Sequence, residues 1–171
     1  FQLYNNYLHH YPHQFGIFLL QQALFRLCAA VGITNFFLAA CVAGHLLFTV
    51  MTVAMFRYLD ENVSPHAAVF GLLLTALYLP VYFQSSISYT DTWSVWSIPC
   101  LLLFGTRAFR AQTVKKAVLY SLLTGLLAGI AMQIKMTGIF VLLAMVLVLL
   151  VKGIRKKQLL AAAVIVAVLA A

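Results

Sequence analysis

The sequence predicts an all-α, polytopic transmembrane helix bundle. Hydrophobic residues make up 64% of the 171 residues and charged residues only 8%, which is too apolar for a soluble globule of this size. Long apolar runs recur along the chain, and most of the few Lys and Arg residues stand at the ends of these runs. Because an apolar run of about 20 residues crosses a bilayer, we expect one membrane domain over residues 1–171.

The chain opens with a polar and aromatic segment over residues 1–15, which is typical of a loop at the membrane interface, where Tyr is favoured. The next segment, 16–28, is apolar but interrupted by Gln21, Gln22 and Arg26. Its apolar part is about 12 residues long, too short to cross a hydrocarbon core of about 30 Å. We therefore expect an external loop over 1–15 and an interfacial helix over 16–28.

A transmembrane bundle is expected over residues 33–171, with about six spans of which the last is incomplete. The expected spans are 33–56, 66–84, 92–109, 115–134, 136–151 and a sixth from residue 158. The polar turn with Asp60, Glu61, Ser64 and Pro65 separates the first two spans and is expected to be solvated, with the next helix beginning at Pro65 or His66.

The basic residues predict how the spans are oriented. If the first span runs inward, nine of the eleven Lys and Arg residues lie in cytoplasmic connections, as the positive-inside rule requires. Only Arg26 and Lys135 then lie outside. Counting 16–28 as a full span would place those nine residues outside, so we reject it. Because the basic residues flank spans, they indicate contact with anionic membrane lipid and not with nucleic acid, despite a net charge of +8.

In this topology three polar segments share the external side: the loop before Gly16, the connection 84–93 and the turn 133–138. Asp91 is the only acidic residue outside the turn at 60–61, and it stands where a helix begins. It can cap that helix, and a capping residue can also line a site. Lys135 interrupts an apolar stretch, and a Lys at mid-membrane costs roughly 2.5–3.5 kcal/mol. We expect it at a turn, where it either snorkels to the interface or binds an anionic phosphate.

The histidines of the first segment, His9, His10 and His13, raise the question of a metal site. Pro12 argues against the regular helix that would bring two imidazoles together, so no metal is expected there. A plain interfacial loop, or contact with a phosphate or sugar, remains open for these residues.

Several short motifs resemble one known group of membrane enzymes. Tyr11–Gly16, "YPHQFG", resembles a YPxxxG-type signature that closes the first large external loop of polyprenyl-phosphate-sugar-dependent glycosyltransferases with the C-type membrane fold. This group includes protein O-mannosyltransferase-like and aminoarabinose-transferase-like proteins. "YTDT" at 89–92 resembles the second external loop of the group, and "GLLAGIAMQIKMTG" at 125–138 resembles its Gly-rich helix that ends in a basic residue. The resemblance follows the element order over almost the whole chain.

The resemblance implies transfer of a hexose or pentose from a polyprenyl-phosphate donor to a cell-envelope glycan, lipid or protein, at the external face of a bacterial plasma membrane. By this analogy Lys135 holds the donor phosphate, with His9, His10 and His13 as secondary candidates. Asp91 and Tyr89 bind sugar hydroxyls or orient the loop, and Tyr11 lines the donor groove. A divalent metal occurs in some relatives, but this segment has no paired-carboxylate site for one, so no cofactor is expected.

The catalytic base of such enzymes is usually an acid early in the first external loop, which leads us to expect it upstream of Phe1. The chain starts without Met and stops at Ala171 inside an apolar run. We therefore expect a fragment that lacks the first span and is inactive alone. The donor sugar, the polyprenol, the acceptor and the oligomeric state are left open.

Two other classes of function remain open. A transporter or flippase would use Asp91 and Lys135 as an ion or substrate relay, although the chain shows no repeated pair of broken helices. A non-catalytic membrane scaffold would need none of the three external segments.

Overall fold

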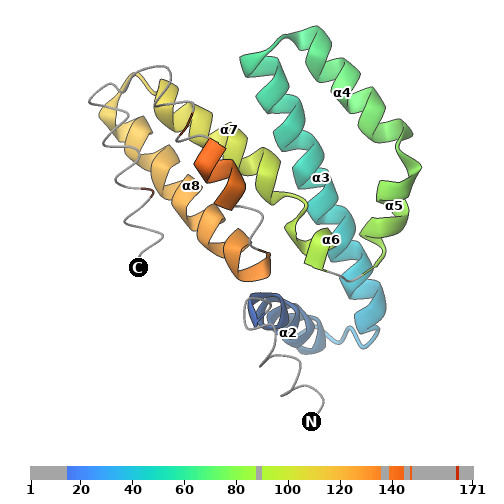
Figure 1. Ribbon diagram of the computed structural model, residues 1–171. Helices are drawn as coiled ribbons and strands as arrows, with labels where there is room; N and C mark the ends of the chain where they lie inside the picture. Colours follow the sequence, from blue (N-terminus) through green and yellow to red (C-terminus); the bar gives the residue numbers. More distant parts are fainter. Residues whose placement is uncertain (1–14, 88–89, 136–138, 145–146, 148–164, 166–171) are drawn as a thin grey trace.

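The computed structural model is all-helical in the part of the chain that it describes, which comprises residues 15–87, 90–135, 139–144, 147 and 165 (Figure 1). No strand occurs in these residues, which confirms the predicted all-α class. The helices are α2 Phe15–Ala30, α3 Phe36–Asn62, α4 Pro65–Leu77, α5 Leu79–Ser85, α6 Thr90–Ser94, α7 Ser97–Arg110 and α8 Val114–Ile134.

Two helices, α3 and α8, are long and apolar enough to cross a membrane, with 27 and 21 residues. At about 1.5 Å per residue they measure about 40 and 30 Å, against about 30 Å for a hydrocarbon core. They correspond to the first and fourth expected spans. Because α3 exceeds the hydrocarbon thickness, its last turns, which carry Arg57, Asp60 and Glu61, can lie beyond it.

The second and third expected spans are each divided into two helices, which corrects the prediction of single helices there. Residues 66–84 form α4 and α5, with the break at Tyr78 and with Pro80 in the first turn of α5. Proline lacks the amide hydrogen that a continuous helix needs and its ring clashes with the preceding turn. Residues 92–109 begin as the five-residue α6 and continue as α7 after Val95 and Trp96. The spans expected at 136–151 and from 158 lie largely outside the described residues.

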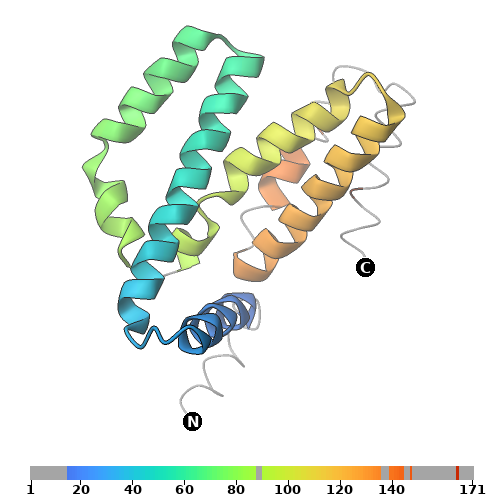
Figure 2. The same cartoon turned by 180° about the vertical axis from the view of Figure 1, so that it is seen from behind.

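Helix α7 packs between α3 and α8, while α4 packs against α3 (Figures 1 and 2). Helix α2 lies across the end of this bundle, where α3 begins and α8 ends, and it is foreshortened in both views. A crosswise helix of 16 residues at the end of a bundle has the orientation expected of an interfacial helix. Its bounds extend those expected, 16–28, by a residue or two at each end.

The bundle has two ends of different charge. At the first, which we call the rim end, lie α2, the start of α3, α6 and the end of α8 with Lys135 (Figure 1). At the second, the basic end, lie the end of α3, the start of α4 and the turn between α7 and α8. The described Lys and Arg residues of the basic end are Arg57, Arg107, Arg110, Lys115 and Lys116. Within the described residues, five of the nine basic residues expected on one side therefore lie together, whereas Arg26 and Lys135 lie at the rim end.

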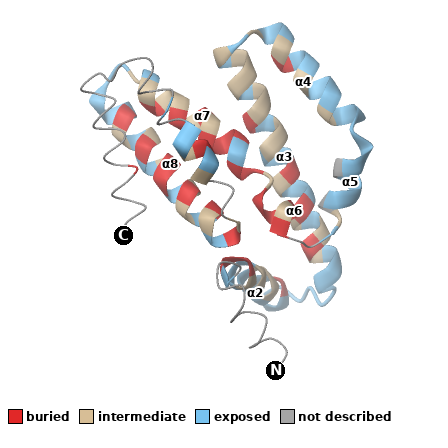
Figure 3. Cartoon of the chain, viewed as in Figure 1, coloured by how far each residue is buried: buried red, intermediate tan, exposed pale blue. Residues whose placement is uncertain are grey.

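Burial follows the centre of the bundle. Buried residues gather on α6, α7 and α8, whereas the outer faces of α4 and α5 are mostly exposed (Figure 3). Helix α4 buries only Ala68 and exposes large apolar side chains such as Phe70 and Leu77. Exposed apolar faces of this extent suit contact with lipid chains. The chain is a helical membrane bundle.

Candidate functional site

An ion pair joins α6 to the end of α8 at the rim end. The ammonium nitrogen Nζ of Lys135 donates a hydrogen bond to Oδ1 of Asp91. The two residues are 44 positions apart in sequence. Their side chains are 37% and 38% exposed respectively, so a ligand can reach the pair from outside. The structure therefore brings together the two charged residues that the sequence placed on one side.

Each partner of this pair is fixed by its place in a helix. Lys135 caps α8 in an extended conformation, and its amide donates to the carbonyl of Ala131 at 2.8 Å. A cation at a helix carboxyl end is favourable because the last carbonyls carry partial negative charge. Asp91 lies in the first turn of α6, and its carbonyl accepts a hydrogen bond from Oγ of Ser94 at 3.2 Å.

Helix α2 reaches the same place through Gly16. A Cβ at position 16 would lie 2.5 Å from Cβ of Gln133 and 2.7 Å from its carbonyl carbon, which is closer than real Cβ atoms approach. Only glycine permits this approach of the α2 backbone to the last turn of α8. The start of α2 therefore lies beside the last turn of α8, which ends at Lys135.

An apolar layer supports the ion pair from below. Ile17 of α2, Trp93 of α6, Trp96 at the start of α7, and Ala131 and Ile134 of α8 belong to one buried cluster. The indole of Trp96 donates to the carbonyl of Trp93 at 2.7 Å, which fixes the turn between α6 and α7. Buried aromatic rings anchor the three elements against one another, so the rim is positioned by the core.

Hydrogen bonds to the end of α5 hold α6 in place. Oγ1 of Thr92, a buried residue, lies 2.8 Å from the carbonyl oxygen of Gln84 and 2.7 Å from that of Ile87. The thiol of Cys41 on α3 donates to the carbonyl of Ser86 at 3.3 Å. These contacts fix the turn that presents Asp91.

A small pocket lies beside Asp91, with a volume of about 80 Å³. Its walls combine Gly44, Phe48 and Met51 of α3 with Gln84, Asp91, Thr92 and Val95. At about 30 Å³ per molecule it has room for two or three waters. A sugar ring would therefore have to rest on the exposed rim and not inside this pocket.

The remaining candidate site residues from the sequence are not among those that the structure describes. His9, His10, Tyr11, His13 and Tyr89 lie outside the described residues. Among the residues that the structure does describe, no group of three or more His, Cys, Asp or Glu side chains could hold a metal ion.

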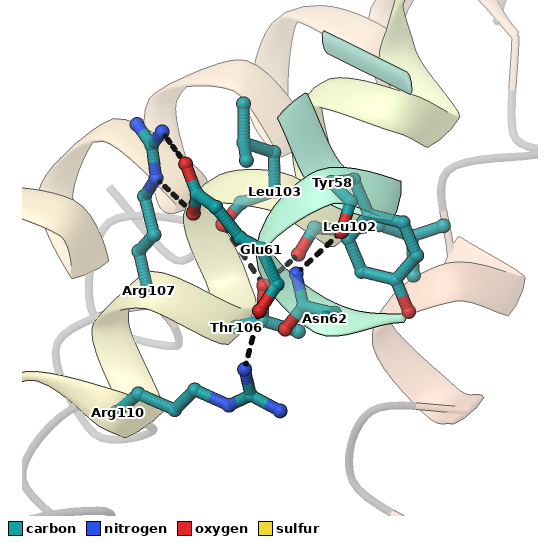
Figure 4. Close-up of polar contacts among 8 residues, drawn as sticks. All are labelled: Tyr58, Glu61, Asn62, Leu102, Leu103, Thr106, Arg107 and Arg110. Atoms are coloured by element: carbon teal, nitrogen blue, oxygen red, sulfur yellow. Dashed lines mark hydrogen bonds and ion pairs between the residues drawn. The ribbon is translucent and has the colours of Figure 1, made fainter. Parts of the chain in front are cut away.

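One polar cluster was not expected from the sequence. Glu61 belongs to the last turn of α3 and not to a solvated loop, and Arg107 of α7 binds its carboxylate with two hydrogen bonds, one of them 2.9 Å from Nε to Oε2 (Figure 4). The sequence feature that could have indicated this cluster is an acidic residue expected at the same membrane face as several basic residues. This cluster lies at the basic end, away from Asp91.

The rim can offer a cation to an anionic ligand and a carboxylate to hydroxyl groups. An ammonium group is a compact point charge for phosphate, and a carboxylate accepts hydrogen bonds from hydroxyls. Exposed apolar side chains surround this end, among them Phe15 and Leu19 of α2 and Ile87. The arrangement suits a ligand that combines a phosphate with a lipid chain.

Comparison with known proteins gives one match. The family described as dolichyl-phosphate-mannose-protein mannosyltransferase matches residues 13–171. The match covers the charged rim, the core beneath it and the basic end. No curated protein and no solved structure matches the chain.

Proposed function

Because the chain belongs to the dolichyl-phosphate-mannose-protein mannosyltransferase family, a branch of the C-type membrane glycosyltransferases, we propose that it moves a sugar from a polyprenyl-phosphate donor to a cell-envelope acceptor. The acceptor is a hydroxyl group of a glycan, lipid or protein, and the reaction takes place at the external face of a bacterial plasma membrane. The family match favours this function over a transporter or a scaffold.

The exposed ion pair between Lys135 and Asp91 is the observation that carries the proposal. In the donor complex the phosphate takes the place of Asp91 at the ammonium of Lys135. Asp91 is then released to accept hydrogen bonds from sugar hydroxyls. The polyprenyl chain lies against the exposed apolar side chains of α2, where Phe15, Leu19 and Leu20 face outward.

The reaction breaks one bond and forms one. The oxygen of the acceptor hydroxyl attacks the anomeric carbon of the sugar, and the bond from that carbon to the phosphate oxygen breaks. The electron pair of that bond leaves with the polyprenyl phosphate, and a general base takes the hydroxyl proton. Lys135 stabilises the charge that develops on the leaving phosphate. We do not give Asp91 the role of base, because in the donor complex its carboxylate accepts hydrogen bonds from the sugar hydroxyls.

The residues outside the described part of the chain complete this proposal. His9, His10 and His13 are secondary contacts for the donor phosphate. Tyr11 lines the donor groove, and Tyr89 contacts the sugar together with Asp91. The close approach of Gly16 to Gln133 supports the placement of the first segment near Lys135.

The direct test replaces Lys135 with Met in the full-length protein and measures transfer from a polyprenyl-phosphate sugar. Loss of one charged group that acts in the transition state is expected to lower kcat by about 10²-fold or more. Lys115→Met is the matched control, since it removes the same charge from the basic end, and it should keep normal turnover. Unchanged turnover of a normally expressed Lys135→Met variant would remove Lys135 from the mechanism.

A further inference from the structure

A polar pocket of about 550 Å³ opens at the basic end, between the end of α3 and the turn from α7 to α8. Its polar and charged walls come from three helix ends and include Glu61, Asn62, Arg107, Arg110, Thr113 and Lys116. Asp91 and Lys135 lie at the opposite end of the bundle, so the proposed sugar transfer does not use this pocket.

One of the three cations in the pocket has a structural role. Arg107 binds both carboxylate oxygens of Glu61 (Figure 4). Its guanidinium carbon lies 5.9 Å from the ring centre of Phe104 and 6.0 Å from that of Tyr120. The bidentate pair and the two rings fix the orientation of this guanidinium. Arg107 therefore joins α3 to α7 and shapes one wall of the pocket.

The other two cations form no side-chain ion pair within the described part of the chain, and the carboxylate near Arg110, that of Glu61, is already bound by Arg107. Arg110 donates from Nη1 to the backbone carbonyl of Glu61 at 3.3 Å, and neither Arg110 nor Lys116 has an ion-pair partner there. The first turn of α8, which holds Lys116, contains no acidic residue. Two cations that face one concave space favour a ligand with several anionic oxygens.

The surface below the pocket favours a lipid as the source of those oxygens. Tyr120 lines the pocket, one turn further along α8 than Lys116. Leu119 lies three positions after Lys116, and Leu122 three positions after Leu119, and both are exposed on the same helix. A ligand with its phosphate between Arg110 and Lys116 could lay its acyl chains along these leucines.

We propose that this pocket binds the phosphate-bearing headgroup of an anionic phospholipid from the leaflet at the basic end. Basic pockets between transmembrane helices on the cytoplasmic side suit such headgroups. The site is independent of the proposed transfer reaction, because it uses other residues at the other end of the bundle. Bound lipid would hold the α7–α8 turn against α3.

The test measures lipid binding to the full-length protein by native mass spectrometry, with phosphatidylglycerol as the probe and phosphatidylcholine for comparison. The pocket variant Arg110→Gln/Lys116→Gln keeps Arg107 and Glu61. Each lost cation is expected to weaken binding about fivefold, so the dissociation constant for phosphatidylglycerol should rise about 25-fold. The control Arg57→Gln/Lys115→Gln removes two exposed charges from the same end that do not line the pocket, and it should change binding by less than about threefold.

The proposal would be overturned if phosphatidylglycerol binding were weakened equally in both double variants, or if it were not weakened in the pocket variant. An excess of inorganic phosphate distinguishes the two sources of phosphate. If it displaces phosphatidylglycerol from the wild-type protein, the site binds free phosphate and the lipid proposal is wrong. Thermal unfolding checks that the pocket variant is folded; if it is not, the single variants Arg110→Gln and Lys116→Gln replace it, each with an expected loss of about fivefold.

Discussion

The ion pair between Asp91 and Lys135 depends on the residues next to it in sequence. Ile17, Trp93 and Ile134 are buried together, and each stands one or two positions from Gly16, Asp91 or Lys135. The polar groups are thus carried on the surface of a packed core, which limits their freedom to move. Both charges were predictable as ends of apolar runs, since lipid excludes them from the middle of a span. Their direct contact was not, because it depends on packing between helices far apart in sequence.

The contact between Gly16 and Gln133 can be tested by adding a single methyl group at position 16. In Gly16→Ala the new methyl group would meet the backbone of Gln133, so α2 must move away from α8. We expect a loss of about 1–3 kcal/mol in the free energy of unfolding, as for other overpacked sites. It can be measured as a lower thermal unfolding midpoint of the full-length protein in detergent.

Gly129→Ala is the matched control for that variant. Gly129 lies within α8, and nothing lies within 4 Å of the position that its Cβ would take. Alanine favours a helix over glycine by about 0.5–1 kcal/mol, so this change should leave the midpoint unchanged or raise it. If both variants behaved alike, the close contact between Gly16 and Gln133 would be contradicted.

At the level of the helices, the fold depends on the positions where helices are interrupted as well as on the long spans. Pro80 divides one expected span, and the turn at Val95 and Trp96 divides the next. A hydropathy pattern does not predict such breaks, since apolar residues continue through them. Pro80 was the available signal for the first break. The short helix α6 that results depends on contacts to α5 and α3 and not on its own length, because helices of one turn are unstable alone.

Thr92→Val tests how far α6 depends on those contacts. Valine keeps the shape of the side chain but removes the hydroxyl from the carbonyls of Gln84 and Ile87. The expected cost is about 1–2 kcal/mol in the free energy of unfolding. Sugar transfer should also fall, because the turn that presents Asp91 is loosened. Both effects can be followed on purified full-length protein by thermal unfolding and by turnover.

Thr49→Val is the control for this change. The hydroxyl of Thr49 is exposed on α3 and contacts the carbonyl of His45, one turn back in the same helix, at 2.9 Å. Its loss leaves contacts between helices intact, so stability and turnover should stay close to wild type. A Thr92→Val variant as stable and as active as Thr49→Val would show that α6 needs no hydroxyl to hold it.

In the molecule as a whole, the two groups of charged residues lie at opposite ends of the bundle. The rim end carries a reachable ion pair near a crosswise helix, and the basic end carries an Arg–Glu link and a cationic pocket. This division was predictable from the chain, because Arg57, Arg107 and Lys116 fall at one set of helix ends and Asp91 and Lys135 at the other. The pocket itself was not, since Glu61 and Arg107 are 46 positions apart and meet only when α3 packs against α7.

Cysteine labelling in intact cells tests this division most directly. Single cysteines are introduced as Ile87→Cys, Gln133→Cys and Lys115→Cys, in a full-length protein whose natural Cys28, Cys41 and Cys100 are replaced by alanine. All three target positions are exposed, so a membrane-impermeant maleimide can reach them. We expect label at 87 and 133 in intact cells and at 115 only after the membrane is opened. The account would be contradicted if positions 87 and 133 were labelled from opposite sides of the membrane. It would also be contradicted if position 115 were labelled from the same side as both of them.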